Sequence, residues 1–460
     1  MTSRPAPQNM RKFLAIWAGQ VISLIGSGLT SFGLAVWIFQ RTGAATPFAL
    51  TALFSTLPRI VLAPVAGVVA DRWNRRLIMI LADTGSALVT LTALLLMLSG
   101  QFAIEHIYLI ALAGAVCGAF QEPAYTASIT QLVPAAHLGR ANGLVQLSQA
   151  LEMLAAPIIA GALFPLIGLA GLITIDLLTF GAAVGALLLI PVPQPAAAPR
   201  SERNGARQFA HDLAFGFRYL AARPGLLGLL LFAALANFLL NGATVLTGPL
   251  VLTFSTPAVL GLMQSVLGLG MLAGSVVISA WGGPRRRVAG SLSFVALMAV
   301  GLALVGVWPS PWTVGAGLAL MVFCAPVASG CNQAIFQAKV APEVQGRVFA
   351  VRSMIARSML PLATLLAGPL ADQVFEPLLQ PGGAWAATGL GALLGTGPGR
   401  GMGLMFVLAG VLLLAATALA ALNPRLRAVE TDLPDAAPAA APAPEVRPAP
   451  AAGIAPATSP

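Results

Sequence analysis

Residues 67–76 read Gly-Val-Val-Ala-Asp-Arg-Trp-Asn-Arg-Arg, a charged turn between apolar runs at 48–70 and 77–99. A run of roughly 20 apolar residues is long enough to cross the hydrocarbon core of a bilayer as a helix. Because lipid offers the backbone no hydrogen-bond partners, each run is expected to satisfy its own backbone groups as a helix. The stretch therefore predicts two membrane-spanning helices joined by a short turn, with its arginines at the membrane surface.

The same pattern covers most of the 460 residues. Hydrophobic residues make up 58% of the chain and charged residues only 9%, whereas an ordinary soluble domain is about 25% charged. This composition excludes a soluble enzyme and a soluble nucleic-acid-binding protein. Together with the first pair, the remaining apolar runs predict an all-α polytopic membrane protein with twelve transmembrane helices. They lie at 13–39, 106–132, 141–163, 169–190, 226–254, 258–281, 288–308, 313–338, 347–371 and 401–422.

The apolar runs form two sets of six, separated by a polar stretch. We therefore expect two six-helix bundles, at 1–191 and 225–422, joined by a linker at 192–224. The segment 423–460 is rich in Pro and Ala and has too few large apolar residues to bury a core. It is expected to be a disordered tail.

The second part of the linker has the pattern of a surface helix. Phe209, Leu213, Phe217 and Leu220 fall on one helical stripe, with basic residues elsewhere around the helix. A helix with one apolar stripe and a basic remainder is typical of segments that lie in the membrane interface.

Basic residues gather on one side of the expected helices. Twenty of the 25 Lys and Arg residues lie in the termini, the linker and the loops on that same side, and only Arg41 and Arg400 lie in loops on the other side. Lys and Arg are retained on the cytoplasmic side of membrane proteins. We therefore expect both termini and the linker to be cytoplasmic.

Short motifs repeat between the two halves. Residues 131–134, followed by Gly139-Arg140, have a counterpart in residues 337–342, followed by Gly346-Arg347. Weak internal symmetry between two six-helix halves is a mark of secondary transporters, in which the cargo binds between the halves near the membrane midplane.

The turn at 67–76 resembles the loop signature G-x-x-x-D-R-x-G-R-R of the major facilitator superfamily, with Asn74 in place of the second glycine. The resemblance covers about residues 11–422 and implies the major facilitator fold of two pseudo-symmetric six-helix bundles. It also implies a gate, in which Asp71 holds the cytoplasmic side closed against the span at 347–371 with Arg352 as its partner. Gly67 is expected to allow close helix packing. The full gating motif is Gly67, Asp71, Arg72, Arg75, Arg76 and Arg352.

Two further stretches, Phe13-Leu-Ala-Ile-Trp17-Ala-Gly19-Gln20 and Gln121-Glu122-Pro123-Ala124, resemble members of the macrolide-efflux type, a branch that also includes siderophore exporters. This resemblance implies an exporter in a bacterial cytoplasmic membrane, driven by proton antiport. The chain departs from many antiporters in two places. Residues 114–118 lack the arginine found midway along the fourth span, and the fifth-span pattern G-P-x-x-G-G appears only as Ala-Pro-Ile-Ile-Ala-Gly at 156–161.

Charged residues also lie inside the expected spans. A charge at the centre of a bilayer helix costs about 2.5–3.5 kcal/mol, so such residues are expected to face a cavity or a partner. We interpret Glu122 and Asp176 as the leading proton-coupling sites, with Glu152 third and Arg59 as their basic neighbour. The alternative is a fixed ion pair of Arg59 with Glu122 or Glu152 that only holds helices together. Asp83 lies in the span at 77–99 and has no assigned role.

Polar side chains on the other spans are candidates for lining the cargo cavity. They are Gln20, Asn237, Asn241, Gln264, Asn332, Gln333 and Arg357. A broad, mainly apolar cavity with few polar anchors suits amphipathic cargo, such as macrolide-like drugs or secondary metabolites, better than sugars. An importer or a lipid translocator on the same scaffold remains an alternative.

A membrane-embedded enzyme is disfavoured. The three histidines do not form an H-E-x-x-H arrangement, the three cysteines have no zinc spacing, and there is no Gly-rich phosphate loop. We expect no cofactor and no metal. The expected partners are an amphipathic cargo, protons and the lipid bilayer, with no nucleic acid, and the protein is expected to be a monomer.

Overall fold

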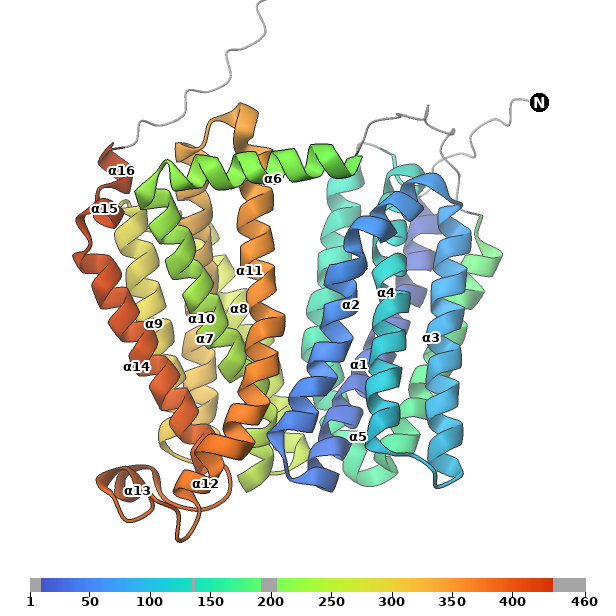
Figure 1. The fold of residues 1–460 in the computed structure, drawn as a ribbon. Helices are drawn as coiled ribbons and strands as arrows, with labels where there is room; N and C mark the ends of the chain where they lie inside the picture. The colour runs from blue at the N-terminus through green and yellow to red at the C-terminus, as the bar shows by residue number, and fades with distance from the viewer. Residues whose placement is uncertain (1–9, 135–136, 192–204, 433–460) are drawn as a thin grey trace, which may run out of the picture.

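The computed structural model describes residues 10–134, 137–191 and 205–432. In these segments the chain is almost entirely helical, and the long helices run between two ends of the molecule (Figure 1). The helix α6 (Gly205–Ala221) lies across one of these ends, which we call the linker end; the opposite end is the far end. The long helices are α1 (Met10–Thr42), α2 (Ala45–Arg72), α3 (Arg75–Leu98), α4 (Ile104–Leu132), α5 (Leu138–Leu189), α7 (Pro224–Phe254), α8 (Pro257–Trp281), α9 (Arg287–Val307), α10 (Pro311–Lys339), α11 (Pro342–Leu370) and α14 (Arg400–Leu422).

These helices form two bundles, which confirms the predicted all-α membrane fold. In the N-terminal half, α1 packs on α5, and α4 packs on α2 and α3; in the C-terminal half, α9 packs on α10 and α14, and α7 packs on α11. By length and hydropathy, 11 helices of the described segments are able to cross a membrane. One of them, α5, has 52 residues, which at about 1.5 Å per residue is more than twice the hydrocarbon thickness.

The helix α5 therefore supplies two of the twelve expected spans. It bends back at Gly168, whose φ of 63° and ψ of −172° are non-helical. Glycine adopts a positive φ without steric cost, because it has no Cβ atom. This single residue replaces the loop that the sequence predicted between 163 and 169.

A folded segment follows α11 at the far end, where the sequence analysis assigned no structure. It consists of the π-helical turn η2 (Ala371–Phe375) and the short helices α12 (Glu376–Leu379) and α13 (Gly389–Leu394). The carboxylate of Glu376 accepts hydrogen bonds from the backbone N–H groups of Gly399 (3.1 Å) and Met402 (3.0 Å). It thus caps α14, because the N-cap residue Gly399 has no side chain that could do so.

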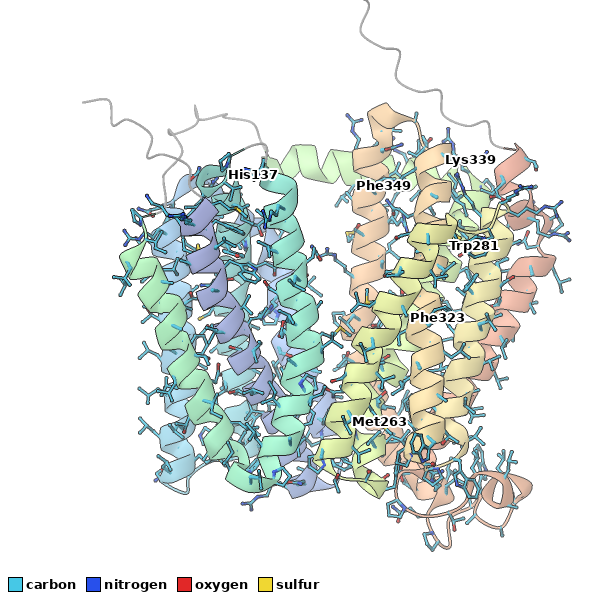
Figure 2. All side chains as sticks on the ribbon, turned by 180° about the vertical axis from the view of Figure 1, so that it is seen from behind. His137, Met263, Trp281, Phe323, Lys339 and Phe349 are labelled. Carbon is cyan, nitrogen blue, oxygen red and sulfur yellow. The ribbon has the colours of Figure 1, made fainter. Side chains whose placement is uncertain are left out.

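The two halves touch each other near the far end. A methyl group placed on Gly161 of α5 would lie 2.7 Å from the Pro257 carbonyl oxygen of α8, so the two backbones are in direct contact there. Ser265 Oγ of α8 also donates a hydrogen bond of 2.8 Å to the Leu154 carbonyl oxygen of α5. Figure 2 shows Met263 of α8 toward this end and Lys339 and Phe349 at the linker end. The small residues at 156–161 thus allow the two halves to pack closely.

A second contact between the halves is a helix cap. Asp372 accepts hydrogen bonds from the backbone N–H groups of Ala45 (2.8 Å) and Thr46 (2.7 Å), the first residues of α2. The N-cap residue of α2 is Ala44, which has no polar side chain. The N–H groups at the start of α2 are therefore satisfied by Asp372 from the other half of the protein. In Figure 1, α2 and α11 approach each other near the far end and diverge toward the linker end.

The linker end differs from two expectations. The prediction of close helix packing at Gly67 is wrong for this structure. A methyl group on Gly67 would have no atom within 4 Å, because α2 and α11 diverge toward the linker end. The expectation of a disordered tail from 423 is also wrong at its start. Two short helices follow α14 there, α15 (Pro424–Arg427) and α16 (Val429–Asp432). The rest of the tail, 433–460, and linker residues 192–204 lie outside the described residues.

The short C-terminal helices are tied to the bundle by polar contacts. Glu430 Oε1 accepts a hydrogen bond of 2.7 Å from the backbone N–H of Arg287, the first residue of α9, and Lys339 Nζ donates to the Glu430 carbonyl oxygen at 2.7 Å. Burial of Val429 and Leu426 adds an apolar contact. These contacts order the start of the predicted tail.

Replacing Glu376 with Ala is expected to destabilise the far-end segment, because the N–H groups of Gly399 and Met402 lose their acceptor. Loss of a helix cap costs about 0.5–2 kcal/mol. We expect a lower melting temperature in nanodiscs and faster cleavage at a protease site inserted between 383 and 388. The control is Glu105→Ala, which removes an exposed carboxylate near the start of α4. It should change neither the melting temperature nor the cleavage rate. Equal cleavage rates in the Glu376 variant and the parent would contradict this role.

Candidate functional site

A central cleft lies between the two bundles. It is a cavity of about 870 Å³ lined by α1, α2, α4 and α5 of the first half and by α7 and α8 of the second. Its lining brings together five of the residues that the sequence selected, Gln20, Arg59, Glu122, Glu152 and Gln264. It also includes Gln121, the neighbour of Glu122 in the chain, which was not selected. The lining is otherwise largely apolar or small. The cleft is therefore the place where residues from both halves meet a common space.

Arg59 is not locked in an ion pair. Among the described residues it has no nitrogen within 4.0 Å of a carboxylate oxygen of Glu122 or Glu152, so the fixed pair considered from the sequence is absent from this structure. Its guanidinium lies against Gly118 of α4, where a methyl group would be 2.8 Å from Nη2. Its positive charge still acts on Glu152 across the cleft. Glu122 is exposed to the cleft and Glu152 is half-buried.

A second cavity, of about 370 Å³, lies within the N-terminal bundle and shares Gln20, Arg59 and Gln121 with the central cleft. Two buried carboxyl groups line it. Asp176, predicted as a coupling residue, is 2% exposed and accepts hydrogen bonds from Ser27 Oγ (3.1 Å) and Thr90 Oγ1 (3.5 Å). The other is Asp83, which is 6% exposed.

A chain of hydrogen bonds connects Asp83 with the cleft. Gln20 Nε2 donates to Asp83 Oδ2 at 2.8 Å, and Gln121 Nε2 donates to Gln20 Oε1 at 2.7 Å. Gln20 therefore joins α1, α3 and α4, and it leads from a buried carboxyl group to the residue beside Glu122. Sequence reasoning did not select Asp83. The available signal was an acid within an apolar run, but its partner lies 63 residues away in the chain.

A third cavity, of about 210 Å³, lies within the C-terminal bundle. Asn237, Asn332 and Arg352, all selected from the sequence, line it together with mainly small and apolar residues of α7, α9, α10 and α11. Arg352 Nη1 donates a hydrogen bond of 2.6 Å to Gln333 Oε1, and its guanidinium lies 4.7 Å from the centre of the Phe336 ring. The structure thus joins Arg352 and Gln333 directly.

Three of the predicted cavity residues line none of the three cavities. Gln333 is one of them and is connected to the third cavity only through its hydrogen bond with Arg352. Arg357 is exposed on α11 and lines none of the three cavities. Asn241 Nδ2 donates to the Asn237 carbonyl oxygen of its own helix at 2.7 Å and is absent from the same three linings. The reason is that a position in a span does not fix which face of the helix meets a cavity.

The arginines of the 67–76 motif bind helix ends. Arg75 Nη1 donates to the Ala127 carbonyl oxygen of α4 at 2.8 Å, and Arg76 donates to the carbonyl oxygens of Leu187 and Leu188 at the end of α5, both at 2.8 Å. Basic groups at helix C-termini satisfy free carbonyl groups and offset the helix dipole. The side chains of Asp71 and Arg72 lie outside the described residues, so the predicted Asp71–Arg352 contact stays a prediction.

Groups that would hold a metal ion are lacking: no cluster of three or more His, Cys, Asp and Glu side chains with that capacity occurs in the segments that the structure describes. The candidate site therefore consists of the cleft, the two adjoining polar cavities and the carboxyl, amide and guanidinium groups that line them.

Sequence comparison matches the model of the Major Facilitator Superfamily over residues 16–364. Macrolide efflux protein A of Streptococcus pyogenes is 27% identical over 376 residues, which cover 79% of this chain and 90% of that protein. Multidrug efflux pump Tap of Mycolicibacterium fortuitum is 28% identical over 376 residues, covering 78% and 88% of the two chains.

Solved structures show the same fold at lower identity. A bacterial homologue of the human lysosomal transporter Spinster, in an inward-facing and unoccupied conformation, superposes with a TM-score of 0.66 at 16% identity, covering 91% of this chain and 96% of that one. A bacterial homologue of the iron transporter ferroportin in an inward-facing state has a TM-score of 0.60 at 14% identity, covering 90% and 99%.

Replacing Gln20 with Leu is expected to destabilise the N-terminal bundle, because Asp83 loses its donor and Gln121 loses its acceptor. Each buried polar group left unpaired costs about 1–3 kcal/mol, whereas replacing both partners by apolar groups is nearly neutral. The melting temperature in nanodiscs should therefore fall for Gln20→Leu and partly recover in the double variant Gln20→Leu, Asp83→Leu. Gln101→Leu, at an exposed position between α3 and α4, is the control. A double variant less stable than the single one would count against the network.

Proposed function

The chain belongs to the Major Facilitator Superfamily, and from this premise we propose that it is a secondary active exporter of amphipathic small molecules, such as macrolide-like drugs or secondary metabolites. It exchanges cargo for protons by alternating access. The family match confirms the resemblance predicted from residues 67–76, and the family and the fold are those of a transporter and not of an enzyme. Relatives named as macrolide and multidrug efflux proteins support export as the direction.

The cleft that both halves line is the observation that carries this proposal. Its volume of about 870 Å³ lies within the roughly 300–1,000 Å³ of sites for drug-sized ligands. Two of its lining residues, Tyr125 and Thr247, have hydroxyl groups that are buried without a hydrogen-bond partner among the described residues. A buried polar atom that has no partner in the protein is suited to binding a water molecule or a ligand. Few polar anchors in an apolar cleft favour amphipathic cargo.

Alternating access is supported by where the halves touch. The contacts of α5 with α8 and of Asp372 with α2 close the far end, and α2 and α11 diverge toward the linker end. Because basic residues gather at the linker end, we assign that end and both termini to the cytoplasm of a bacterial cell. The structure then corresponds to an inward-facing state of a protein in the cytoplasmic membrane.

Proton coupling is proposed for the carboxyl groups at the cavities. Glu122 and Asp176 are the leading sites and Glu152 is third, as predicted from the sequence. Support comes from the exposure of Glu122 to the cleft, the burial of Asp176 among hydroxyl groups and the charge of Arg59 near Glu152. Protonation of such a group in one conformation and its release in the other would tie transport to the proton gradient.

Neutral variants at the three acids test the coupling. In everted membrane vesicles with an internal pH dye, erythromycin is expected to trigger proton release in the parent protein and at least about tenfold less in Glu122→Gln, because a site that does not titrate cannot exchange a proton. The same measurement on Asp176→Asn and Glu152→Gln shows which of these acids also takes part in proton exchange. Glu105→Gln, an exposed acid at the far end, is the control. Retained coupling in all three variants would reject these sites. The absence of any response to erythromycin in the parent protein would favour an importer or a lipid translocator.

Two carboxylates at opposite ends are proposed to act as gates with opposite effects. Asp71 would hold the linker end closed against α11 and Arg352, and Asp372 holds the far end closed by capping α2. A contact made in only one state biases the equilibrium between states. Asp372→Ala should therefore favour a far-end-open state, and Asp71→Asn should favour the state seen here.

Cysteine labelling in nanodiscs separates these outcomes, in a background in which the three native cysteines are replaced by Ser. Ala49→Cys reports on the far end, where Ala49 is 1% exposed, and Gln149→Cys reports on the cleft. Asp372→Ala should speed labelling at 49 and slow it at 149, and Asp71→Asn should slow it at 49. Labelling rates that shift in the same direction in both variants would contradict opposed gates.

A further inference from the structure

The charges that line the cavities are divided between the two halves. The central cleft and the N-terminal cavity hold the acids Asp83, Glu122, Glu152 and Asp176, with Arg59 as their basic neighbour. In the C-terminal cavity, Arg352 supplies the single charge among the described lining residues. A cargo that spans both halves therefore meets acidic groups on one side and a basic group on the other.

Among the described side chains, the contacts of Arg352 are with neutral groups. One of its N–H groups donates to the Gln333 amide, and its guanidinium faces the Phe336 ring. A guanidinium has five N–H donors in a planar fork that matches a carboxylate, so donors remain for a ligand in the cavity that Arg352 lines. A cationic group within a membrane span is costly without a counter-charge, which favours an anionic ligand.

Asn332 adds a second requirement. Asn332 lines the same cavity, and its Oδ1 atom is buried without a hydrogen-bond partner among the described residues. An amide oxygen is an acceptor only, so it calls for an N–H or O–H donor on the ligand. The complementary chemical group is therefore a carboxylate with a hydroxyl or amino group next to it.

The cavity is placed to bind one end of a larger molecule. Its volume is about 210 Å³, against about 870 Å³ for the central cleft. Leu240 of α7 lines the cavity and Thr244 lines the cleft. Residues four positions apart are neighbours on one helix face, so the two spaces adjoin along α7.

From these contacts we propose that the C-terminal cavity is a subsite for a carboxylate group of the cargo, bound by Arg352, with Asn332 accepting a hydrogen bond from the adjacent hydroxyl or amino group. The proposal rests on the proposed export function and adds amphipathic compounds with an acidic end to its cargo. The apolar part of such a molecule would occupy the central cleft.

Two fluorescent probes that differ by one carboxylate test this subsite. Nε-dansyl-lysine carries an α-amino and a carboxylate group, and dansylcadaverine is the same molecule without the carboxylate. Both are titrated against the full-length protein in nanodiscs at neutral pH. Arg352→Gln should raise the Kd of dansyl-lysine about tenfold or more, because a charge-assisted bidentate contact is lost, and should change that of dansylcadaverine less than about twofold.

Three further variants separate binding from folding. Arg352→Lys keeps the charge and should retain most of the preference for the carboxylate probe. Asn332→Leu should weaken the binding of dansyl-lysine more than the binding of dansylcadaverine. Arg285→Gln removes an exposed charge between α8 and α9 and should change neither Kd.

The subsite would be overturned if Arg352→Gln weakened the binding of both probes equally. It would also be overturned if the Kd of dansyl-lysine were the same in this variant and in the parent. Failure of the parent to bind dansyl-lysine would overturn it as well. Because binding is measured without a proton gradient, these outcomes are independent of proton antiport, which the vesicle experiment tests with erythromycin. The two proposals can therefore fail separately.

Discussion

The close approach of α5 and α8 is the contact on which the shape of the molecule depends. Lipid chains are as apolar as the helices, so helices in a membrane associate through close packing and hydrogen bonds. Gly161 and Gly261 meet at this crossing, and a side chain on either would collide with the backbone of the other helix. With the halves joined there, the divergence of α2 and α11 leaves the cleft between the halves toward the linker end.

Several charges at the ends of the bundle satisfy helix termini. Asp372 caps α2, Glu376 caps α14 and Glu430 binds the start of α9, while the motif arginine Arg76 binds the end of α5. Each contact joins segments that are distant in the chain. Three charged residues at the cavities are different. Among the described residues, Asp83, Asp176 and Arg352 contact amides, hydroxyls and an aromatic ring. They are the groups that a cargo or a proton is able to engage.

The two polar cavities complement each other across the cleft. In the N-terminal half, Gln20 connects the buried Asp83 with Gln121, beside Glu122. In the C-terminal half, Arg352 rests on Gln333. The cavities of the first half thus carry acids together with Arg59, and the cavity of the second half carries Arg352. This asymmetry links the proposed proton sites with the proposed carboxylate subsite.

The sequence by itself determined the membrane class, the twelve spans and the family, because apolar length, basic loops and the 67–76 motif are local properties of the chain. It also selected Glu122, Glu152 and Asp176, since an acid in an apolar run stands out without knowledge of its neighbours. Only the tertiary structure decided that Arg59 pairs with neither Glu122 nor Glu152 and that Arg357 lies outside the cavities. The partners of Asp83 and Asp372 are 63 and more than 300 residues away, and such contacts depend on helix rotation and on how the halves pack, which the sequence of a single span does not encode.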